Sequence, residues 1–317
     1  MNSGGVVLHL PEGWLLDRSE MPPFYHKLQH GFEELGIRCT LEEVDASDPQ
    51  SRIAGDRDFH IFNHRRVVHP RALNAGVAYV YPFWNLDPQG IRAHSSIADM
   101  PFRAHKVDGD KARAFLGKLR GRWAEQRQSR YAQPEDREDI PENAVAVFFQ
   151  SEGHRGVDET CFMDRWQMLE ATLLGWPGPV VVKPHPREME EAVFVRLLEV
   201  QARHPRLVIS QGNIHDILSA CVRVVTINSA VGIEAYMHRK PVILCGQTDF
   251  HHIADTARAP DELIALLGKA PAGRVYAKYL YWYFCRNCVD AGRADVAGQA
   301  VRRIEATGFE LVRGNGG

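Results

Sequence analysis

Short apolar segments alternate with helix-like segments from residue 144 to residue 245. The apolar segments are rich in β-branched residues, which favour strands, and each ends at a polar loop. This alternation predicts an α/β fold with a parallel sheet covered by helices. The expected strands are Ala144–Phe149, Pro179–Lys183, Leu207–Ser210, Val222–Ile227 and Pro241–Cys245, and the expected helices are Cys161–Leu174, Arg187–Ala202, Ile214–Cys221 and Ala230–His238.

The N-terminal half shows a looser alternation of the same kind. A helix is expected at Pro23–Leu35, among strands at Val6–Leu10, Ile37–Val44, Phe59–Asn63 and Val77–Tyr81. Residues 126–141 are highly charged and interrupted by prolines, which is typical of an interdomain linker. A chain of 317 residues suits two domains. We therefore expect two Rossmann-like domains, 1–135 and 143–317, the second closed by helices Asp261–Leu267 and Arg274–Val289.

Composition narrows the classes of partner. A formal charge of -2 gives no basic excess, so no nucleic-acid partner is expected. No apolar run approaches the roughly 18 residues of a membrane span, so any membrane contact should be peripheral. The first residues lack a charged region followed by a long apolar one, so no signal peptide and a cytoplasmic location are expected. The pair Cys285 and Cys288 has the spacing of metal ligands, but no second pair completes a site.

Two strand ends carry residues suited to an anion. Lys183-Pro184-His185-Pro186 follows one strand, and Asn228-Ser229-Ala230 follows another. Open α/β sheets bind ligands at the carboxyl ends of their strands, and a helix start favours phosphate. A nucleotide-phosphate site is therefore predicted, without a cofactor or metal, because no acidic pair follows a strand. Its expected substrate-binding residues are Lys183, His185, Asn228, Ser229, Ala230 and Gly232.

These motifs, with Gln150 upstream and Arg239-Lys240-Pro241-Val242 downstream, resemble a known family. They are similar to the capsule polysaccharide transferases that add β-linked 3-deoxy-D-manno-oct-2-ulosonic acid (Kdo) from CMP-Kdo, over about residues 145–255. The resemblance implies a GT-B architecture, in which two Rossmann-like domains face each other across a cleft. It also implies CMP-Kdo as donor and a capsule or lipopolysaccharide glycan as acceptor.

The resemblance further implies catalytic roles for Asp158, His185 and Gln150. Asp158 would be the nucleophile of a retaining double displacement, a reaction that requires a carboxylate at the anomeric carbon. His185 would neutralise the leaving phosphate, and Glu234 would bind the ribose of CMP. Glu152 and Glu159 are rival nucleophiles, because the spacing from Gln150 to Asp158 is longer than the family's. Asp158 or Thr160 could instead cap the helix expected near Cys161.

In the first domain, Asp87-Pro88-Gln89-Gly90-Ile91-Arg92 is similar to an element of the family's acceptor domain. Asp87, Arg92 and Ser95 are therefore expected near the acceptor. Two other functions stay open at this point. The chain could be an inverting CMP-sugar transferase such as a sialyltransferase, which product stereochemistry distinguishes. It could also be a non-catalytic protein that binds a nucleotide or glycan, which turnover of CMP-Kdo distinguishes.

Overall fold

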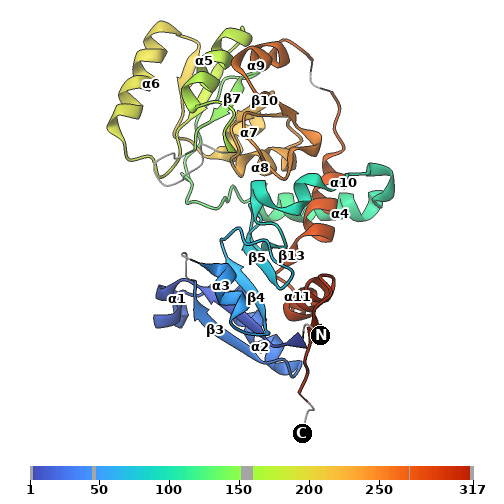
Figure 1. Ribbon diagram of the computed structural model, residues 1–317. Coiled ribbons are helices and arrows are strands. Elements are labelled where there is room, and N and C mark those ends of the chain that lie inside the picture. Colours follow the sequence, from blue (N-terminus) through green and yellow to red (C-terminus); the bar gives the residue numbers. More distant parts are fainter. Residues whose placement is uncertain (1–2, 45–47, 151–159, 271, 315–317) are drawn as a thin grey trace. The chain divides into compact units, whose positions relative to one another are not determined.

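The computed structural model describes residues 3–44, 48–150, 160–270 and 272–314. It divides into two compact units (Figure 1). The first unit contains the chain up to Met100 and returns to include residues from Tyr283 onward, and the second contains Pro101–Trp282. These units differ from the predicted domains 1–135 and 143–317. The C-terminal segment packs against strands formed at the start of the chain, and a discontinuous unit leaves no mark in local sequence patterns.

The first unit is built on a six-stranded mixed sheet with the order β13-β6-β5-β4-β2-β3. Strands β2 to β5 are parallel neighbours, whereas β6 runs antiparallel to both β5 and β13. Two short strands, β1 (Ser3–Gly4) and β14 (Glu310–Leu311), pair separately. The sheet strands are β2 (Val6–Leu10), β3 (Cys39–Glu43), β4 (Phe59–Asn63), β5 (Ala72–Val77), β6 (Phe83–Asp87) and β13 (Val289–Asp290).

Helices α2 (Pro23–Glu34) and α11 (Val296–Glu305) complete the core of this unit. Pro23 opens α2, where a missing N–H costs nothing, and α2 buries Phe24, Tyr25, Leu28 and Phe32. Residues from α11 join the same cluster, which explains why the C-terminal segment belongs here. The smaller helical elements are α1 (Glu12–Leu16), η1 (Arg18–Glu20), α3 (Pro49–Ala54), η2 (Arg92–His94) and η3 (Ser96–Asp99).

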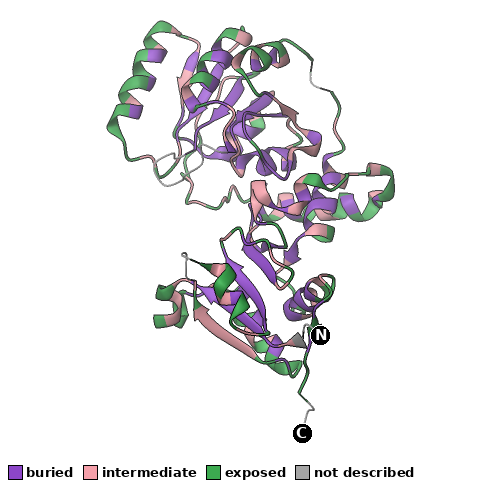
Figure 2. Ribbon diagram, in the orientation of Figure 1, coloured by how far each residue is buried: buried purple, intermediate pink, exposed green. Residues whose placement is uncertain are grey.

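The second unit contains a six-stranded sheet in which every pairing is parallel, with the order β12-β11-β10-β7-β8-β9. Its three longest strands, β7, β8 and β10, are wholly buried, as expected for strands covered on both faces (Figure 2). The chain leaves β7 toward β8 and β9, then returns to β10 on the other side of β7. The strands are β7 (Val145–Phe148), β8 (Val180–Lys183), β9 (Leu207–Ile209), β10 (Arg223–Thr226), β11 (Val242–Leu244) and β12 (Asp255–Thr256).

The helices of the second unit follow the predicted order. The helices between the strands are α5 (Arg165–Gly175), α6 (Glu191–Arg203), α7 (Ile214–Ala220), α8 (Val231–Met237) and η7 (His251–Ile253), with α9 (Pro260–Leu267) after the last strand. Before the sheet come η4 (Ala104–Lys106), α4 (Gly109–Leu119) and the π-helical turn η5 (Arg120–Ala124). Apolar residues of α5, α6 and α9 pack with those of the strands in one core.

Three expectations about elements are wrong. Val77–Tyr81 is not a strand, because β5 ends at Val77 and residues 78–82 connect it to the antiparallel β6. Arg274–Val289 is not one helix. It forms α10 (Tyr276–Tyr281) and the π-helical turn η8 (Trp282–Asn287), after which the chain enters β13.

The third wrong expectation is the interdomain linker predicted at residues 126–141. It lies inside the second unit, and its side chains contact α7 and α8. A polar, proline-rich composition is shared by linkers and by polar segments that wrap a domain, so composition alone misplaced the boundary.

No helix among the described residues is long and apolar enough to cross a membrane. All six cysteines are free thiols, and Cys285 is exposed. Across the described ranges, no three His, Cys, Asp or Glu side chains come together as a metal site.

Two helical glycines give opposite predictions for alanine substitution. A Cβ at Gly117 in α4 would meet nothing within 4 Å, whereas a Cβ at Gly232 in α8 would lie 2.7 Å from the Phe250 ring. Gly117→Ala should therefore raise the free energy of unfolding by about 0.5–1 kcal/mol, because alanine restricts the unfolded chain. Gly232→Ala should lower it by about 1–3 kcal/mol through overpacking. Urea unfolding of both variants checks this, and a stabilised Gly232→Ala would contradict the packing.

Candidate functional site

Strands β7 and β10 are neighbours in the middle of the second sheet, at the point where the chain changes direction. Phe148 of β7 pairs with Thr226 of β10, and Gln150 and Asn228 follow each of them by two residues. Ligands of open α/β sheets bind at this kind of topological switch point, beyond the carboxyl ends of the strands. The fold therefore brings together two residues that the sequence predicted for the donor site.

The side-chain amides of Gln150 and Asn228 are anchored in the same way. Gln150 Nε2 donates to Cys161 Sγ at 3.7 Å, and Asn228 Nδ2 donates to Thr160 Oγ1 at 3.1 Å. Their oxygens, Gln150 Oε1 and Asn228 Oδ1, are buried and accept no hydrogen bond from the described residues. Because buried acceptors are normally paired, these two atoms suit a ligand that supplies hydrogen-bond donors, such as sugar hydroxyl groups.

His185 lies in the loop after β8, the strand next to β7. Its Nδ1 accepts from the backbone N–H of Arg187 at 3.1 Å, and its carbonyl accepts from the N–H of Glu188 at 2.9 Å. A neutral ring that accepts at Nδ1 carries its proton on Nε2. The loop thus fixes the ring so that Nε2 is the hydrogen-bond donor.

A buried ion pair fastens this loop to helix α5. Arg165 donates to Glu188 at 2.6 Å, with side-chain exposures of 7% and 6%. Glu188 also accepts from the backbone N–H of Glu190 at 3.1 Å. Removing either member of such a pair leaves an uncompensated buried charge. The pair therefore holds the loop that carries His185 in place, a role that no local sequence pattern indicated.

Tyr131 contacts His185 from the segment first predicted to be a linker. The two ring centroids lie 5.1 Å apart in an edge-to-face arrangement, and the Arg187 guanidinium lies 4.9 Å from the Tyr131 ring. Arg130 lies 5.8 Å from the same ring. Tyr131 thus gathers two guanidinium groups and an imidazole beside the end of β8. A single aromatic residue within a polar stretch was the one signal in the sequence.

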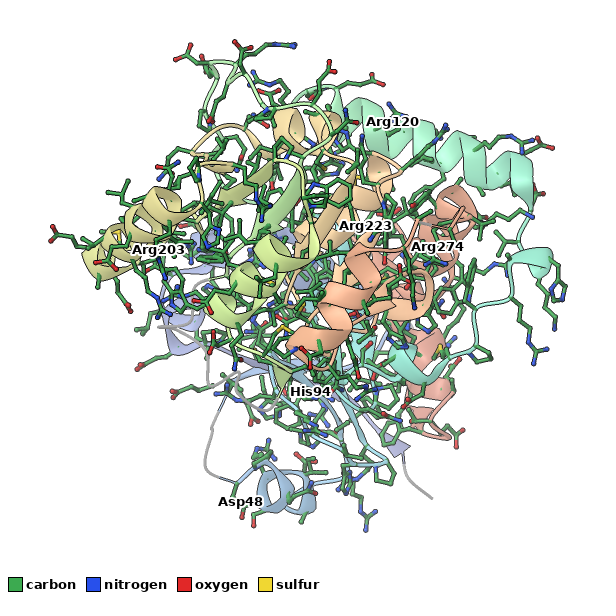
Figure 3. All side chains as sticks on the ribbon, turned by 90° about the horizontal axis from the view of Figure 1, so that it is seen from above. Asp48, His94, Arg120, Arg203, Arg223 and Arg274 are labelled. Carbon is green, nitrogen blue, oxygen red and sulfur yellow. The ribbon has the colours of Figure 1, made fainter. Side chains whose placement is uncertain are left out.

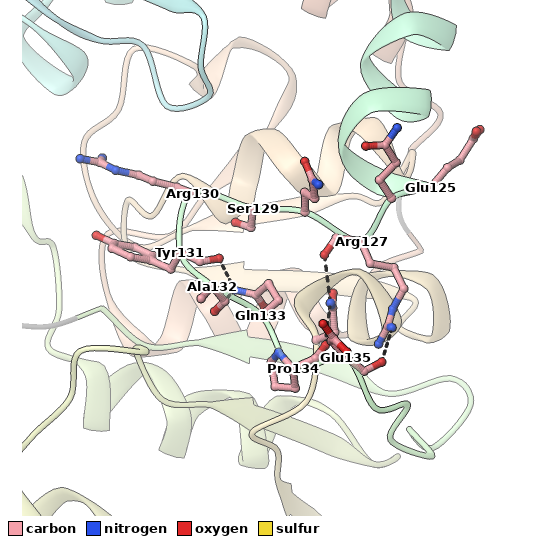
Figure 4. Close-up of a pocket in the computed structure, with 12 residues that line it drawn as sticks. Glu125, Arg127, Ser129, Arg130, Tyr131, Ala132, Gln133, Pro134 and Glu135 are labelled. Carbon is pink, nitrogen blue, oxygen red and sulfur yellow. Dashed lines mark hydrogen bonds between the residues drawn. The ribbon is translucent and has the colours of Figure 1, made fainter. Parts of the chain in front are cut away.

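The segment that carries Tyr131 is held on helix α7. Arg127 binds the Asp216 carboxylate with bonds of 3.1 and 2.7 Å. Asn213 donates to the carbonyls of Arg127 and Pro134, and Gln133 accepts from the Ile214 N–H. Residues 125–135 and Asn213 line a pocket of about 420 Å³ (Figure 4). These polar residues, whose sequence resembles that of a linker, form an ordered part of the second unit.

Glu234 is buried in α8, and its partner is Ser129 from the same segment. Ser129 Oγ donates to Glu234 Oε1 at 2.6 Å. Burial raises the pKa of Glu234 to about 7, and the bond from Ser129 opposes this shift. Ser129 is therefore the hydrogen-bond partner of this buried carboxyl group. The contact of Glu234 with the ribose of CMP, which the resemblance implied, stays a prediction.

Glu234 should make stability depend on pH. Its folded pKa of about 7 lies above the ordinary glutamate value of 4.5, so the folded state keeps a proton that the unfolded state has lost. The resulting stabilisation is complete below pH 4.5 and is lost as pH rises through 7. Glu234→Gln should remove this loss. The free energy of unfolding of the variant, relative to that of the wild type, should therefore rise by about 2–3 kcal/mol as the pH increases from 5 to 8. Urea unfolding measures the difference, and a pH-independent difference would contradict the raised pKa.

Four other predicted residues have structural contacts that account for them. Lys183 is buried and donates to the carbonyls of Gln211 and Gly212 at 3.0 and 2.7 Å. Burial lowers the pKa of Lys183, while Glu138 opposes the shift. Gly232 leaves room for the Phe250 ring. Ser229 Oγ accepts from the Val231 N–H at 3.4 Å, and Ala230 stands at the start of α8.

The predicted acceptor residues lie in the first unit. Asp87 accepts hydrogen bonds from the backbone of Gln89, Gly90 and Ser96 and from Ser96 Oγ, so its carboxylate shapes the loop after β6. Arg92 donates its backbone N–H to Asn85 Oδ1 at 3.2 Å, and Ser95 is buried. A contact of Asp87, Arg92 or Ser95 with an acceptor stays a prediction.

Asp158, Glu152 and Glu159 lie outside the described residues. The helix that follows them begins at Arg165 and is capped by Asp164, which accepts from the N–H groups of Trp166 and Gln167 in a capping box. The expectation that Asp158 or Thr160 caps this helix is therefore wrong, because its start lies four residues later than the sequence indicated.

Comparisons with known proteins agree with the predicted resemblance. Residues 165–258 match a family model described as capsule polysaccharide biosynthesis protein. This segment includes α5, the His185 loop and the start of α8. A search of curated proteins finds no match to the chain.

Two solved structures share the fold. Both are KpsC transferases of Thermosulfurimonas dismutans. The β-Kdo 2,7-transferase has a TM-score of 0.58 at 13% identity, covering 95% of this chain and 99% of that one. The β-Kdo 2,4-transferase has a TM-score of 0.52 at 16% identity, covering 86% and 88%. The predicted α/β fold of the GT-B class is thus confirmed.

Proposed function

We propose that this chain is a glycosyltransferase that moves Kdo from CMP-Kdo to a capsule or lipopolysaccharide glycan with retention of configuration. One observation carries the proposal: Gln150, His185 and Asn228 lie at the carboxyl ends of the adjacent strands β7, β8 and β10. The segment that holds two of them matches the capsule family model. The fold shared with two Kdo transferases supports the same assignment.

The leaving phosphate of CMP would be bound beside His185. With Nδ1 accepting from the Arg187 N–H, Nε2 is the ring atom that carries the proton, and Arg187 adds a guanidinium two residues later. A positioned donor or cation at a developing phosphate charge stabilises the transition state. Tyr131 contacts both groups, so we assign it a positioning role for them.

The Kdo group would lie over the switch point. Its hydroxyl groups can donate to Gln150 Oε1 and Asn228 Oδ1, two buried acceptors that the described residues leave unpaired. In the first step a carboxylate oxygen of Asp158 attacks the anomeric carbon, and the bond from that carbon to the phosphate oxygen breaks with its electron pair leaving on CMP. In the second step an acceptor hydroxyl passes its proton to solvent and attacks the same carbon, and the bond to Asp158 breaks with its electron pair returning to the carboxylate. Two inversions give net retention.

The reaction should need no metal. His185 and Arg187 already supply positive charge or donors to the phosphate, so purified protein should release CMP from CMP-Kdo at an unchanged rate in excess EDTA. CMP-sialic acid and UDP-sugars serve as control donors and should be turned over far more slowly. Loss of activity on chelation, restored by Mg²⁺ or Mn²⁺, would overturn metal independence. Preference for another donor would overturn the assignment of CMP-Kdo.

A further inference from the structure

Positive charge is concentrated in a short stretch of the second unit. Residues 103–122 contain seven Lys or Arg and two Asp, which gives a net charge of +5 when His105 is neutral. The whole chain has a net charge of -2, so the remaining residues together carry -7. This separation of charge is much stronger than the overall composition suggested.

The cations lie on the solvent side of η4, α4 and η5. Helix α4 buries Ala112, Leu116 and Leu119 on one side, and it packs against α10. The exposed residues of what we call the α4 face are Arg103, Lys106, Lys111, Arg113, Lys118 and Arg122. Lys111 and Lys118 are seven residues apart, about two helical turns, and so point to the same side. Arg120, labelled in Figure 3, is half-buried at the start of η5.

Four of these cations form no ion pair in the part of the chain that the structure describes. They are Arg103, Lys111, Lys118 and Arg122, which pair with no carboxylate among the described residues. The Arg122 guanidinium lies over the Trp123 ring, 5.7 Å from its centroid. Arg113 forms an ion pair with Asp110. Clustered like charges repel one another, so a surface of this kind is favourable mainly when an anionic partner neutralises it.

The residues between the cations indicate what kind of partner fits. Ala114 and Gly117 are exposed, and a Cβ at Gly117 would meet nothing within 4 Å. The exposed residues of α4 and η5 before Glu125 are Asp110, Lys111, Arg113, Ala114, Gly117, Lys118 and Arg122. None of them has an aromatic ring or an amide, the groups with which proteins stack on or hydrogen-bond to individual sugar rings. A broad layer of negative charge suits this face better than one defined ligand.

We propose that the α4 face docks this protein on the surface of a membrane rich in anionic phospholipid. Each Lys or Arg held near such a surface increases partitioning about five-fold, and the attraction falls off within the Debye length. The apolar side of α4 is occupied by α10, so attachment is electrostatic and the helix does not insert. This inference does not depend on the donor or on the mechanism proposed above.

Vesicle sedimentation tests the proposal. The wild type should bind vesicles of phosphatidylcholine with 30% phosphatidylglycerol, should not bind pure phosphatidylcholine, and should be released at high salt. The triple variant Lys111→Gln, Lys118→Gln, Arg122→Gln should bind roughly 100-fold more weakly, since three cations are removed. A matched control, Arg66→Gln, Arg203→Gln, Lys269→Gln, removes three exposed cations elsewhere and should bind like the wild type. Circular dichroism confirms that both variants are folded.

Three outcomes would overturn the proposal. The first is a wild type that ignores anionic vesicles. The second is equal weakening in the test and control variants, which would show a general charge effect. The third is binding of soluble polygalacturonate, but not of vesicles, in a manner lost only in the test variant. That result would assign the α4 face to an acidic glycan.

Discussion

Replacing Asp158 by Asn should lower kcat by about 10³-fold or more while CMP binding stays nearly intact. Asn has nearly the shape of Asp but cannot readily form a glycosyl ester, so the loss falls on the chemical step. Glu152→Gln and Glu159→Gln are the matched controls, because each removes one carboxylate from the same segment. Both should keep near wild-type turnover.

Intact-protein mass spectrometry of the wild type with CMP-Kdo gives the direct readout. A Kdo adduct should form, and peptide mapping should place it on Asp158. An adduct on Glu152 or Glu159 would move the nucleophile and keep the double displacement. Because Asp164 caps α5, a large loss in Asp158→Asn cannot be attributed to a lost cap on that helix. Unchanged turnover in Asp158→Asn would reject Asp158.

His185→Ala should weaken CMP binding or turnover by roughly 10- to 150-fold. A charge-assisted hydrogen bond contributes about 1.5–3 kcal/mol, which corresponds to this range. Folding should survive, since the Arg165–Glu188 pair holds the loop independently of the ring. His204→Ala, at the end of α6 in the same unit, is the control and should bind CMP like the wild type. Calorimetry and turnover both at wild-type values in His185→Ala would reject the phosphate role.

The second unit was largely predictable from sequence, for a physical reason. Buried parallel strands are continuous apolar runs such as Val180–Lys183, and their carboxyl ends must meet at one edge of the sheet. The closeness of Gln150 to Asn228 at that edge could therefore be predicted without any knowledge of side-chain contacts. The first unit was less predictable. Val77–Tyr81 has the apolar pattern of a strand but forms the connection to an antiparallel strand.

The rest of the site depends on contacts between segments distant in sequence. Tyr131 reaches His185 and Ser129 reaches Glu234 from residues that composition marked as a linker. Arg165 and Glu188 become partners only when α5 and the loop after β8 meet. Polar residues that bond across 23 to 105 positions carry no periodicity. Sequence patterns therefore predicted the strand ends and missed the contacts that order the loops beyond them.

The anomeric configuration of the product tests the central claim most directly. Wild-type protein with CMP-β-Kdo and a capsule-type glycan acceptor should release CMP and form a new Kdo linkage, which nuclear magnetic resonance can assign. The account predicts a β-linked product, formed in the same amount as CMP. An α-linked product would contradict the double displacement, and the absence of any Kdo product with any glycan acceptor would contradict the proposed transferase itself.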